Sequence, residues 1–166
     1  DVFVSNAGYG QPGGLDLPTA DWQRMMNVHT WSHLAAARAA VPGMIERGYG
    51  QFGVTSTIAG KFGFPMRSAY SAAKHGLIGY MDALRSEVSV PHNIQVTNVL
   101  PGSVATDVSR NAVTEDGSRR GKSDANIDAG DDPMDCARAI LDAVENNVPE
   151  LIFAKGMELD LARMRH

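Results

Sequence analysis

Four short runs of hydrophobic and β-branched residues occur at wide intervals along the chain. They cover residues 2–5, 51–56, 94–100 and 150–154. Each run is rich in Val, Ile, Phe or Thr and has few charges, which is typical of strands that are buried on both faces. The pattern therefore predicts four strands, each separated from the next by a long connection.

Apolar residues at helical spacing predict a long helix over about residues 19–47. Its apolar side carries Trp22, Met25, Met26 and Leu34. Thr19 is the expected N-cap, and Asp21 places an acid in the first turn. We expect Pro42-Gly43 to kink or break the helix near its end, because proline has no amide hydrogen to donate.

Two further helices are predicted, one over about residues 66–89 and one that begins after residue 131. Asp132 is the expected N-cap of the last helix, with Pro133 at its first helical position. Apolar residues follow at helical spacing, namely Met134, Ala137, Ile140, Leu141 and Val144. Segment 113–131 is dominated by Gly, Ser, Asp and Arg, so we expect it to be a mobile loop.

Strands and helices thus alternate along the chain. This order predicts the α/β class, with one parallel sheet covered by helices on both faces. The first strand begins without a turn, a cap or an initiator Met ahead of it. We therefore expect residues 1–166 to be one partial domain, with a further segment upstream.

Composition excludes several classes of function. The chain has 166 residues, of which 43% are hydrophobic, and a net charge of −4. These values suit one globular domain and give no indication of nucleic-acid binding. No apolar run is long enough to cross a bilayer and no signal segment opens the chain, so we expect no membrane partner. The one cysteine, Cys136, suits a reducing compartment, and we expect a cytoplasmic protein.

Metal binding is not expected either. The histidines share no spacing with carboxylates or with the cysteine that is typical of metal ligands. The residues considered were His29, His33, His75, His92 and Cys136.

Gly8, Gly10 and Gly13 have the spacing G-x-G-x-x-G of a dinucleotide-binding turn. In that turn the third glycine begins a helix whose amides hold a pyrophosphate. Here Pro12 and Gly14 predict a turn instead of a helix, and no acid ends a second strand about twenty residues later. We therefore interpret the glycines as a flexible loop that leaves the first strand.

Tyr70 and Lys74 are four residues apart near the start of the second predicted helix, so they share one face of it. A free tyrosine has a pKa near 10, and bringing it to neutrality takes about 4 kcal/mol. An ammonium about 4 Å away supplies roughly that much at an effective dielectric constant of about 20. The spacing therefore favours a phenol that exchanges protons near neutral pH. The alternative is an ordinary exposed pair on an amphipathic helix.

Five motifs occur in a fixed order: Asn6-Ala7-Gly8, Asn27, the stretch TSTIAG at 55–60, Tyr70-x-x-x-Lys74 and the stretch PGSVAT at 101–106. They resemble the N-A-G, helix Asn, S-S-x-A-G, Y-x-x-x-K and P-G-x-V-x-T motifs of the short-chain dehydrogenase/reductase family. The resemblance implies a Rossmann-like doubly wound parallel sheet. It also implies hydride transfer between a secondary alcohol or ketone and NAD or NADP. The glycine-rich turn with which family members begin has no counterpart here, so the resemblance implies the catalytic part of an N-terminally truncated domain.

The resemblance also assigns roles to residues. Tyr70 exchanges the hydroxyl proton, Lys74 lowers the pKa of Tyr70 and holds ribose hydroxyls, and the carbonyl of Asn27 holds a relay water. The family spacing places the substrate-holding hydroxyl on Thr57, with Ser56 as the alternative one residue earlier. The implied cofactor contacts are Asn6, Ala7, Gly8, Ser56, Tyr70, Lys74, Pro101, Gly102, Val104 and Thr106.

The substrate pocket is expected between the segment 62–66 and a mobile substrate loop at about 103–131. Phe62, Phe64 and Met66 favour an apolar alcohol or ketone, because such walls reward the burial of carbon surface. The alternative is that these side chains pack into the core or into a subunit contact.

A function of another class is also open, since the chain could be a non-catalytic fragment or dimerisation module that binds no cofactor by itself. The second predicted helix carries small residues that permit close approach of another helix, namely Ala72, Ala73, Gly76, Gly79 and Ala83. They favour a homo-dimer or homo-tetramer, and ordinary packing within the chain is the alternative.

Overall fold

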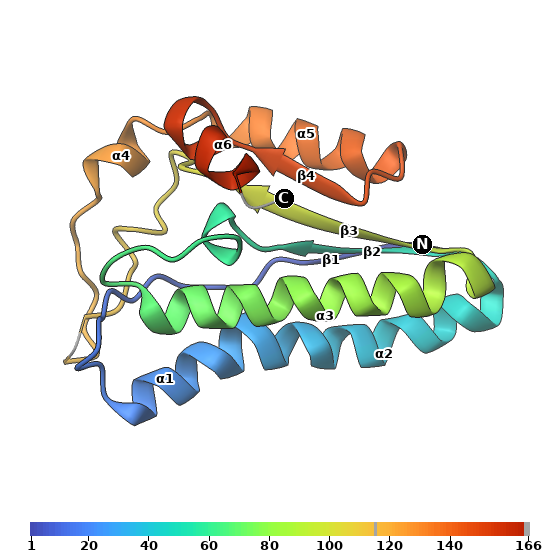
Figure 1. The fold of residues 1–166 in the computed structure, drawn as a ribbon, viewed down its shortest axis with the longest axis horizontal. Coiled ribbons are helices and arrows are strands. Elements are labelled where there is room, and N and C mark those ends of the chain that lie inside the picture. Colours follow the sequence, from blue (N-terminus) through green and yellow to red (C-terminus); the bar gives the residue numbers. More distant parts are fainter. Residues whose placement is uncertain (115, 165–166) are drawn as a thin grey trace.

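Four parallel strands form the central sheet of the computed structural model, which describes residues 1–114 and 116–164 (Figure 1). They are β1 (Val2–Ser5), β2 (Gly50–Thr55), β3 (Ile94–Pro101) and β4 (Glu150–Phe153), and they lie in this order across the sheet. All four predicted strands are confirmed. Helices connect each strand to the next, so the predicted α/β class is confirmed as well.

One continuous helical segment connects β1 to β2. It consists of α1 (Thr19–Met26), a π-helical turn η1 (Asn27–Trp31) and α2 (Ser32–Arg47). The predicted helical span is confirmed. A break at Pro42 is wrong, because α2 continues through it to Arg47 and is capped by Gly48, whose φ is 74°, while a kink there stays a prediction. Val41 and Met44 lie on either side of the proline and are both buried in the main core. Their packing holds the helix together where the amide hydrogen is missing.

The start of α1 differs by one residue from the prediction. Thr19 is the first helical residue, and Pro18 is the N-cap. The Pro18 carbonyl accepts hydrogen bonds from the amides of Asp21 (2.9 Å) and Trp22 (3.1 Å). With φ −55° and ψ 143°, Pro18 already has the extended backbone of a cap residue, so the threonine enters the helix itself.

The other predicted helices correspond to α3 (Ser68–His92) and α5 (Pro133–Glu145). Asp132 caps α5 as expected, since its carboxylate accepts hydrogen bonds from the amides of Met134 (2.7 Å) and Asp135 (3.2 Å). Three elements were not predicted: the 3-10 turn η2 (Ile58–Gly60), α4 (Ala125–Asp128) and α6 (Gly156–Arg163). Each is too short for its periodicity to stand out in the sequence.

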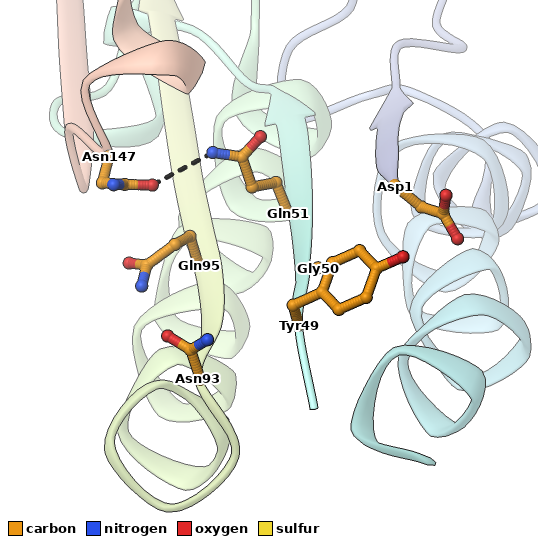
Figure 2. Close-up of a pocket in the computed structure, with 7 residues that line it drawn as sticks. All are labelled: Asp1, Tyr49, Gly50, Gln51, Asn93, Gln95 and Asn147. Atoms are coloured by element: carbon orange, nitrogen blue, oxygen red, sulfur yellow. Dashed lines mark hydrogen bonds between the residues drawn. The ribbon is translucent and has the colours of Figure 1, made fainter. Parts of the chain in front are cut away.

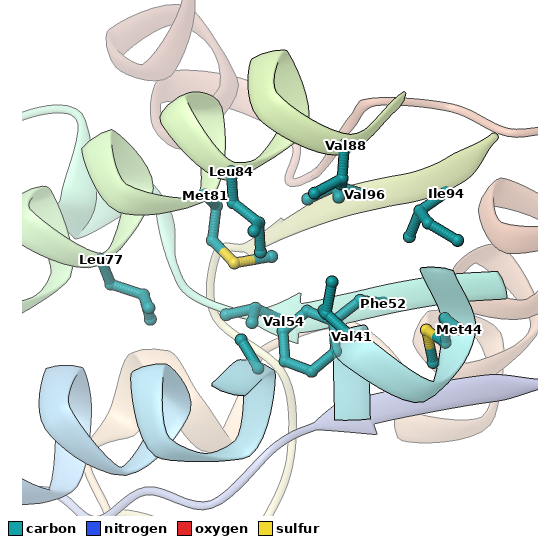
Figure 3. Packing of buried hydrophobic residues seen from close by; sticks show 11 residues of the cluster. Val41, Met44, Phe52, Val54, Leu77, Met81, Leu84, Val88, Ile94 and Val96 are labelled. Carbon is teal, nitrogen blue, oxygen red and sulfur yellow. The ribbon is translucent and has the colours of Figure 1, made fainter. Parts of the chain in front are cut away.

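The main core lies between the sheet and the pair of helices α2 and α3 (Figure 3). Phe52 and Val54 of β2 face these helices and are fully buried. Successive side chains of a strand point to opposite faces of the sheet, so the residue before Phe52 points the other way. Accordingly, the Gln51 side chain donates a hydrogen bond to the Val144 carbonyl of α5, which covers the opposite face. The two faces of β2 are therefore both covered, as the sequence pattern predicts.

Segment 103–131 leaves β3 and returns beside its own start. The Asp131 amide donates to the Ser103 carbonyl, and the Ala105 amide donates to the Asp131 carbonyl, both at 2.9 Å. Between these ends the described residues form α4 and one isolated antiparallel bridge. The segment is thus a loop whose two ends are hydrogen-bonded to each other and which contains a short helix. Its mobility stays a prediction.

Candidate active site

The carboxyl ends of β1, β2 and β3 bring most of the predicted site residues to one edge of the sheet. Asn6 follows β1, Thr57 follows β2, and Pro101 ends β3. Tyr70 and Lys74 belong to the first turns of α3, which packs against β3 and η2. Ligands bind at this edge of open parallel sheets. The structure therefore places the candidate residues where an α/β fold forms a site.

Lys74 is the most deeply buried charged group of the site, with 3% of its surface exposed. Its Nζ donates a hydrogen bond to the Thr55 carbonyl at 3.1 Å and lies 5.9 Å from the centre of the Tyr70 ring. Burial lowers the pKa of Lys74 to about 8. The interpretation of Tyr70 and Lys74 as an ordinary exposed pair is therefore wrong.

The Tyr70 phenol does not have the lowered pKa that the spacing predicts. Burial raises the pKa of Tyr70 above its usual value, while the positive charge of Arg67 and a hydrogen bond with Thr57 act weakly against this rise. Lys74 is not among the causes of this shift, although its ammonium lies 5.9 Å from the centre of the ring. The phenol of this structure is consequently protonated at neutral pH.

Thr57, rather than Ser56, is the hydroxyl that lies beside Tyr70. The Thr57 Oγ1 also donates to the Pro101 carbonyl (3.2 Å) and accepts from the Ala59 amide (3.3 Å), so its position is well defined. Ser56 is buried, and its Oγ has no hydrogen-bond partner among the described residues. Geometry thus supports the assignment that the spacing favours, and the substrate-holding role itself stays a prediction.

Asn27 is not brought to the phenol. It lies at the start of η1 with an exposed side chain, whose Oδ1 accepts a hydrogen bond from Gln23 at 3.0 Å. The helix residue that does contact Tyr70 is His29, with ring centres 5.0 Å apart in an edge-on arrangement. Sequence reasoning considered this histidine only as a metal ligand. The role of the Asn27 carbonyl in holding a relay water needs no direct contact with Tyr70 and stays a prediction.

The loop that follows β1 lies against His29. The Tyr9 amide donates to His29 Nε2 at 3.4 Å, and a Cβ at Gly8 would lie 3.1 Å from the Cε1 of the ring. Asn6, Ala7 and Gly8 are themselves exposed. No helix begins in residues 6–18, so the interpretation of the glycine pattern as a loop is confirmed.

The segment that follows β3 is held by α6. A Cβ at Gly102 would collide with the Glu158 carboxylate, which accepts hydrogen bonds from the amide and the hydroxyl of Ser103 (2.8 and 2.7 Å). Val104 forms a bridge with Asp131, and Thr106 is exposed. This segment is therefore anchored at the sheet before it enters the predicted substrate loop.

Asp124 ties the substrate loop to the start of α3. Its carboxylate pairs with Arg120 (2.6 Å) and Arg67 (3.5 Å) and accepts a hydrogen bond from the Ser109 hydroxyl (2.9 Å). The Arg120 hydrogen bond first, and the Ser109 hydroxyl next, lower the pKa of Asp124. Since Arg67 also acts on the Tyr70 phenol, the loop is fastened directly beside the candidate site.

Two of the three residues expected to wall the pocket pack elsewhere. The rings of Phe62 and Phe64 lie 4.7 Å apart and pack against a cluster of Ile58, Leu100 and Ala162. Met66 differs, because 61% of its surface is exposed. The alternative of core packing therefore holds for both phenylalanines, and only the methionine is free to line a pocket.

A cavity lies at the opposite edge of the sheet (Figure 2). It has a volume of about 270 Å³ at the amino ends of β2 and β3, and it is lined by Asp1, Tyr49, Gly50, Gln51, Asn93, Gln95 and Asn147. These are mainly carboxamides, and the Gln51 side chain bonds to the Asn147 side chain at 3.0 Å. No predicted site residue lines this cavity, so it is separate from the candidate site.

Within residues 1–114 and 116–164, no group of three or more His, Cys, Asp or Glu side chains could hold a metal ion. In the same part of the chain, no helix combines the length and the apolar character that a membrane span requires.

A family profile described as short chain dehydrogenase matches residues 1–117. The chain belongs to the short-chain dehydrogenase family. It is 39% identical over 155 residues to dehydrogenase/reductase SDR family member 7B from Xenopus tropicalis, covering 93% of this chain and 50% of that protein. A dehydrogenase/reductase SDR family protein 7-like from Drosophila melanogaster is 35% identical, covering 100% of this chain and 51% of that protein. The chain thus spans about half the length of the curated relatives it matches.

Solved structures of short-chain dehydrogenases have the same fold. One from Streptomyces avermitilis is similar with a TM-score of 0.80 and 26% identity, over 98% of this chain and 63% of that one. An acetoin dehydrogenase from Enterobacter cloacae has a TM-score of 0.74 and 25% identity, over 96% of this chain and 64% of its own. The predicted Rossmann-like fold class is confirmed.

Helix α3 of this short-chain dehydrogenase presents its small residues in two directions. Ala73 is buried within the chain, whereas Ala72, Gly76, Gly79 and Ala83 are exposed. Packing within the chain therefore explains the small side chain of Ala73 only. The exposed stripe is compatible with contact to another subunit, which stays a prediction.

The buried ammonium makes a testable contribution to stability. Because the folded pKa of Lys74 is about 8 and the usual value is 10.5, the unfolded chain binds more protons between these values. The free energy of unfolding should rise with pH across about pH 8–10, by up to roughly 3 kcal/mol. Tyr70 opposes this rise only near and above about pH 10, since its folded pKa is raised.

In Lys74→Met the free energy of unfolding should no longer rise across about pH 8–10, as measured by urea unfolding at several pH values. Lys122→Met removes an exposed lysine and should leave the rise in place. An equal rise in both variants would show that the Lys74 ammonium is not the buried group that titrates.

Proposed function

We propose that the chain is the catalytic part of an NAD(P)-dependent oxidoreductase that transfers a hydride between a nicotinamide and a secondary alcohol or ketone. The convergence of Tyr70, Lys74 and Thr57 at the carboxyl edge of the sheet carries this proposal. A protonated phenol, a buried cation and a second hydroxyl within one site are the groups that proton exchange at a substrate oxygen requires. Membership of the short-chain dehydrogenase family supports the same reaction.

The residues at this edge fit a nicotinamide cofactor. Three buried polar atoms have no partner among the described residues, namely Thr55 Oγ1, Ser56 Oγ and His29 Nδ1. Buried polar groups are costly when unpaired, so a hydroxyl-rich group at this edge would suit them. Lys74 and the loop 6–8 would hold the ribose side, and the segment 101–106 the nicotinamide side. When bound, the cofactor would supply or accept the hydride; NAD and NADP both fit this set.

A protonated Tyr70 is the form that can act as the general acid in carbonyl reduction. Since burial keeps the phenol protonated at neutral pH, Tyr70 can donate its proton to the substrate oxygen as the hydride reaches the carbonyl carbon. The Lys74 ammonium then stabilises the phenolate until a proton from solvent restores it. Thr57 would donate a hydrogen bond to the same oxygen and orient it. In the reverse direction the same groups would accept the alcohol proton.

The substrate class follows from what remains free at the site. We propose a small alcohol or ketone with an apolar part, which the exposed side chain of Met66 would contact. One structural neighbour is an acetoin dehydrogenase, and acetoin is a small compound of this class. The argument from Phe62 and Phe64 no longer contributes, because both rings are engaged in a core cluster.

Tyr70→Phe should abolish most activity while cofactor binding persists. The tests of activity use an extended protein, in which the pyrophosphate-binding segment implied by the family resemblance precedes Asp1. Removing the general acid should lower kcat by about 10²–10⁴-fold. Steady-state kinetics and cofactor titration measure both effects. Tyr49→Phe is the control, because it alters an exposed tyrosine at the other edge of the sheet and should leave kcat unchanged. If Tyr70→Phe keeps more than about a tenth of the original kcat, Tyr70 is not the general acid.

Thr57→Val and Ser56→Ala separate the two candidate hydroxyls in the extended protein. Thr57→Val keeps the shape of the side chain, and loss of its hydrogen bond to the substrate oxygen should lower kcat by about a hundredfold. Ser56→Ala should change the KM for the cofactor with little effect on kcat. The opposite pattern in the two sets of kinetic constants would assign the substrate oxygen to Ser56.

A second candidate function rests on exposed surfaces. β1 lies at one edge of the sheet, and its Val2, Phe3 and Val4 are exposed; α3 carries the exposed stripe of small residues. Such surfaces suit association with another chain, so residues 1–166 alone could act as a dimerisation module. We expect these residues to bind NAD(P) weakly and to self-associate. Calorimetric titration that found micromolar binding by residues 1–166 would contradict this, and the extended protein provides the comparison.

A further inference from the structure

His29 is a buried group that takes no part in the proton and hydride transfers of the proposed reaction. Only 1% of its surface is exposed, although it lies at the edge of the sheet where the candidate residues meet. Its ring stacks on Tyr9, with centres 5.2 Å apart, and meets Tyr70 edge-on at 5.0 Å. One side chain therefore contacts both the loop after β1 and the phenol of α3.

The π-helical turn η1 explains how a helix residue reaches both partners. In η1, the consecutive residues His29 and Thr30 are both buried, and the Thr30 hydroxyl donates to the Ala73 carbonyl of α3 at 2.9 Å. A π-helical turn shifts the residues that follow it relative to a regular helix, and such turns occur frequently at functional sites. The turn thus fixes η1 to α3 one helical turn from Tyr70.

The ring of His29 is neutral and has a defined acceptor. Burial lowers the pKa of His29 to about 3, and the nearby Lys74 ammonium acts in the same direction. Nε2 accepts the hydrogen bond from the Tyr9 amide, so the proton of the neutral ring belongs on Nδ1. A charged imidazolium would lose this bond and would add a second cation beside Lys74. The ring is therefore suited to hold its neighbours and not to exchange protons at neutral pH.

We propose that His29 is a positioning residue, which sets the loop after β1 through its Nε2 and the Tyr70 phenol through its ring. The two contacts have separate consequences. The Nε2 bond orders the loop that would hold the cofactor, and the ring packing orients the group that would donate the proton. This inference rests on the proposed function as far as the cofactor and the proton are concerned, whereas the contacts themselves are independent of it.

Two substitutions separate the contacts. His29→Phe keeps an aromatic ring against Tyr9 and Tyr70 but removes the acceptor. His29→Gln keeps an acceptor within reach of the Tyr9 amide but removes the ring. His33→Gln is the matched control for exchange at Tyr9, since His33 is buried in the same helical segment but bonds to Ser5 (2.6 Å) and to the backbone of Ala7, two residues before Tyr9.

The first measurement is amide hydrogen exchange of Tyr9 in the 166-residue chain, which needs neither cofactor nor activity. His29→Phe should speed exchange at Tyr9 by about three- to tenfold, the loss expected for one hydrogen bond. His29→Gln and His33→Gln should leave it nearly unchanged. Equal exchange at Tyr9 in all four proteins would overturn the proposal, even if the proposed reaction were correct.

The second measurement is the split between KM and kcat in the extended protein. His29→Phe should raise the KM for the cofactor by about three- to tenfold with kcat nearly unchanged. His29→Gln should lower kcat by a similar factor, and it should move the high-pH limb of kcat/KM to lower pH, because water reaches the phenol. A role in stability alone would lower the melting temperature of both variants and shift neither constant selectively, and that result would overturn the proposal.

Gly8→Ala tests the same contact with the histidine intact, in case a variant of His29 fails to fold. The added methyl would lie 3.1 Å from the ring, so the loop and the ring must move apart. The KM for the cofactor and exchange at Tyr9 should rise together. If neither changes, the loop is not set by His29 and the proposal fails.

Discussion

The hydrogen bond between Lys74 Nζ and the Thr55 carbonyl is the contact on which the candidate site depends. An unpaired ammonium is expensive to bury, and here the last carbonyl of β2 provides its partner at 3.1 Å. The contact fixes the second turn of α3 over the end of the strand, which places Tyr70, one turn earlier, beside Thr57. Gly60 allows η2 to lie close to α3 at Lys74, because a Cβ at Gly60 would lie 3.0 Å from the Lys74 carbonyl. The candidate residues are thus positioned by strand and helix backbone.

Much of this arrangement could be predicted from the sequence, because it follows from topology. Parallel strands end at one edge, so residues at or just after their carboxyl ends, such as Asn6, Thr57 and Pro101, must come together once the strands are recognised. The residue of the first helical segment that contacts Tyr70, which is His29, could not be predicted in the same way. A regular helix has 3.6 residues per turn, and the π-helical turn η1 departs from that period. It leaves Asn27 exposed and buries His29.

The acidity of Tyr70 illustrates a second limit of sequence reasoning. Spacing shows that Lys74 is near, but the pKa depends on how far both groups are removed from water, which only packing determines. In the structure burial outweighs the nearby positive charges. Arg67, the leading charge that opposes burial, is itself paired with Asp124 of the substrate loop. The position of that loop and the charge felt by the phenol are therefore linked through one carboxylate.

The two phenylalanines next to the site show why apolar character does not identify a pocket wall. Phe62 and Phe64 lie between Thr57 and Tyr70 in the sequence, which is where a substrate wall is expected. Their rings nevertheless pack with Ile58 and Leu100, and so connect the turn after β2 to the end of β3. This packing supports the backbone that carries Thr57, whose hydroxyl bonds to the neighbouring Pro101 carbonyl. An apolar segment beside the candidate hydroxyl can thus support the site by holding that hydroxyl in place, without itself forming a pocket wall.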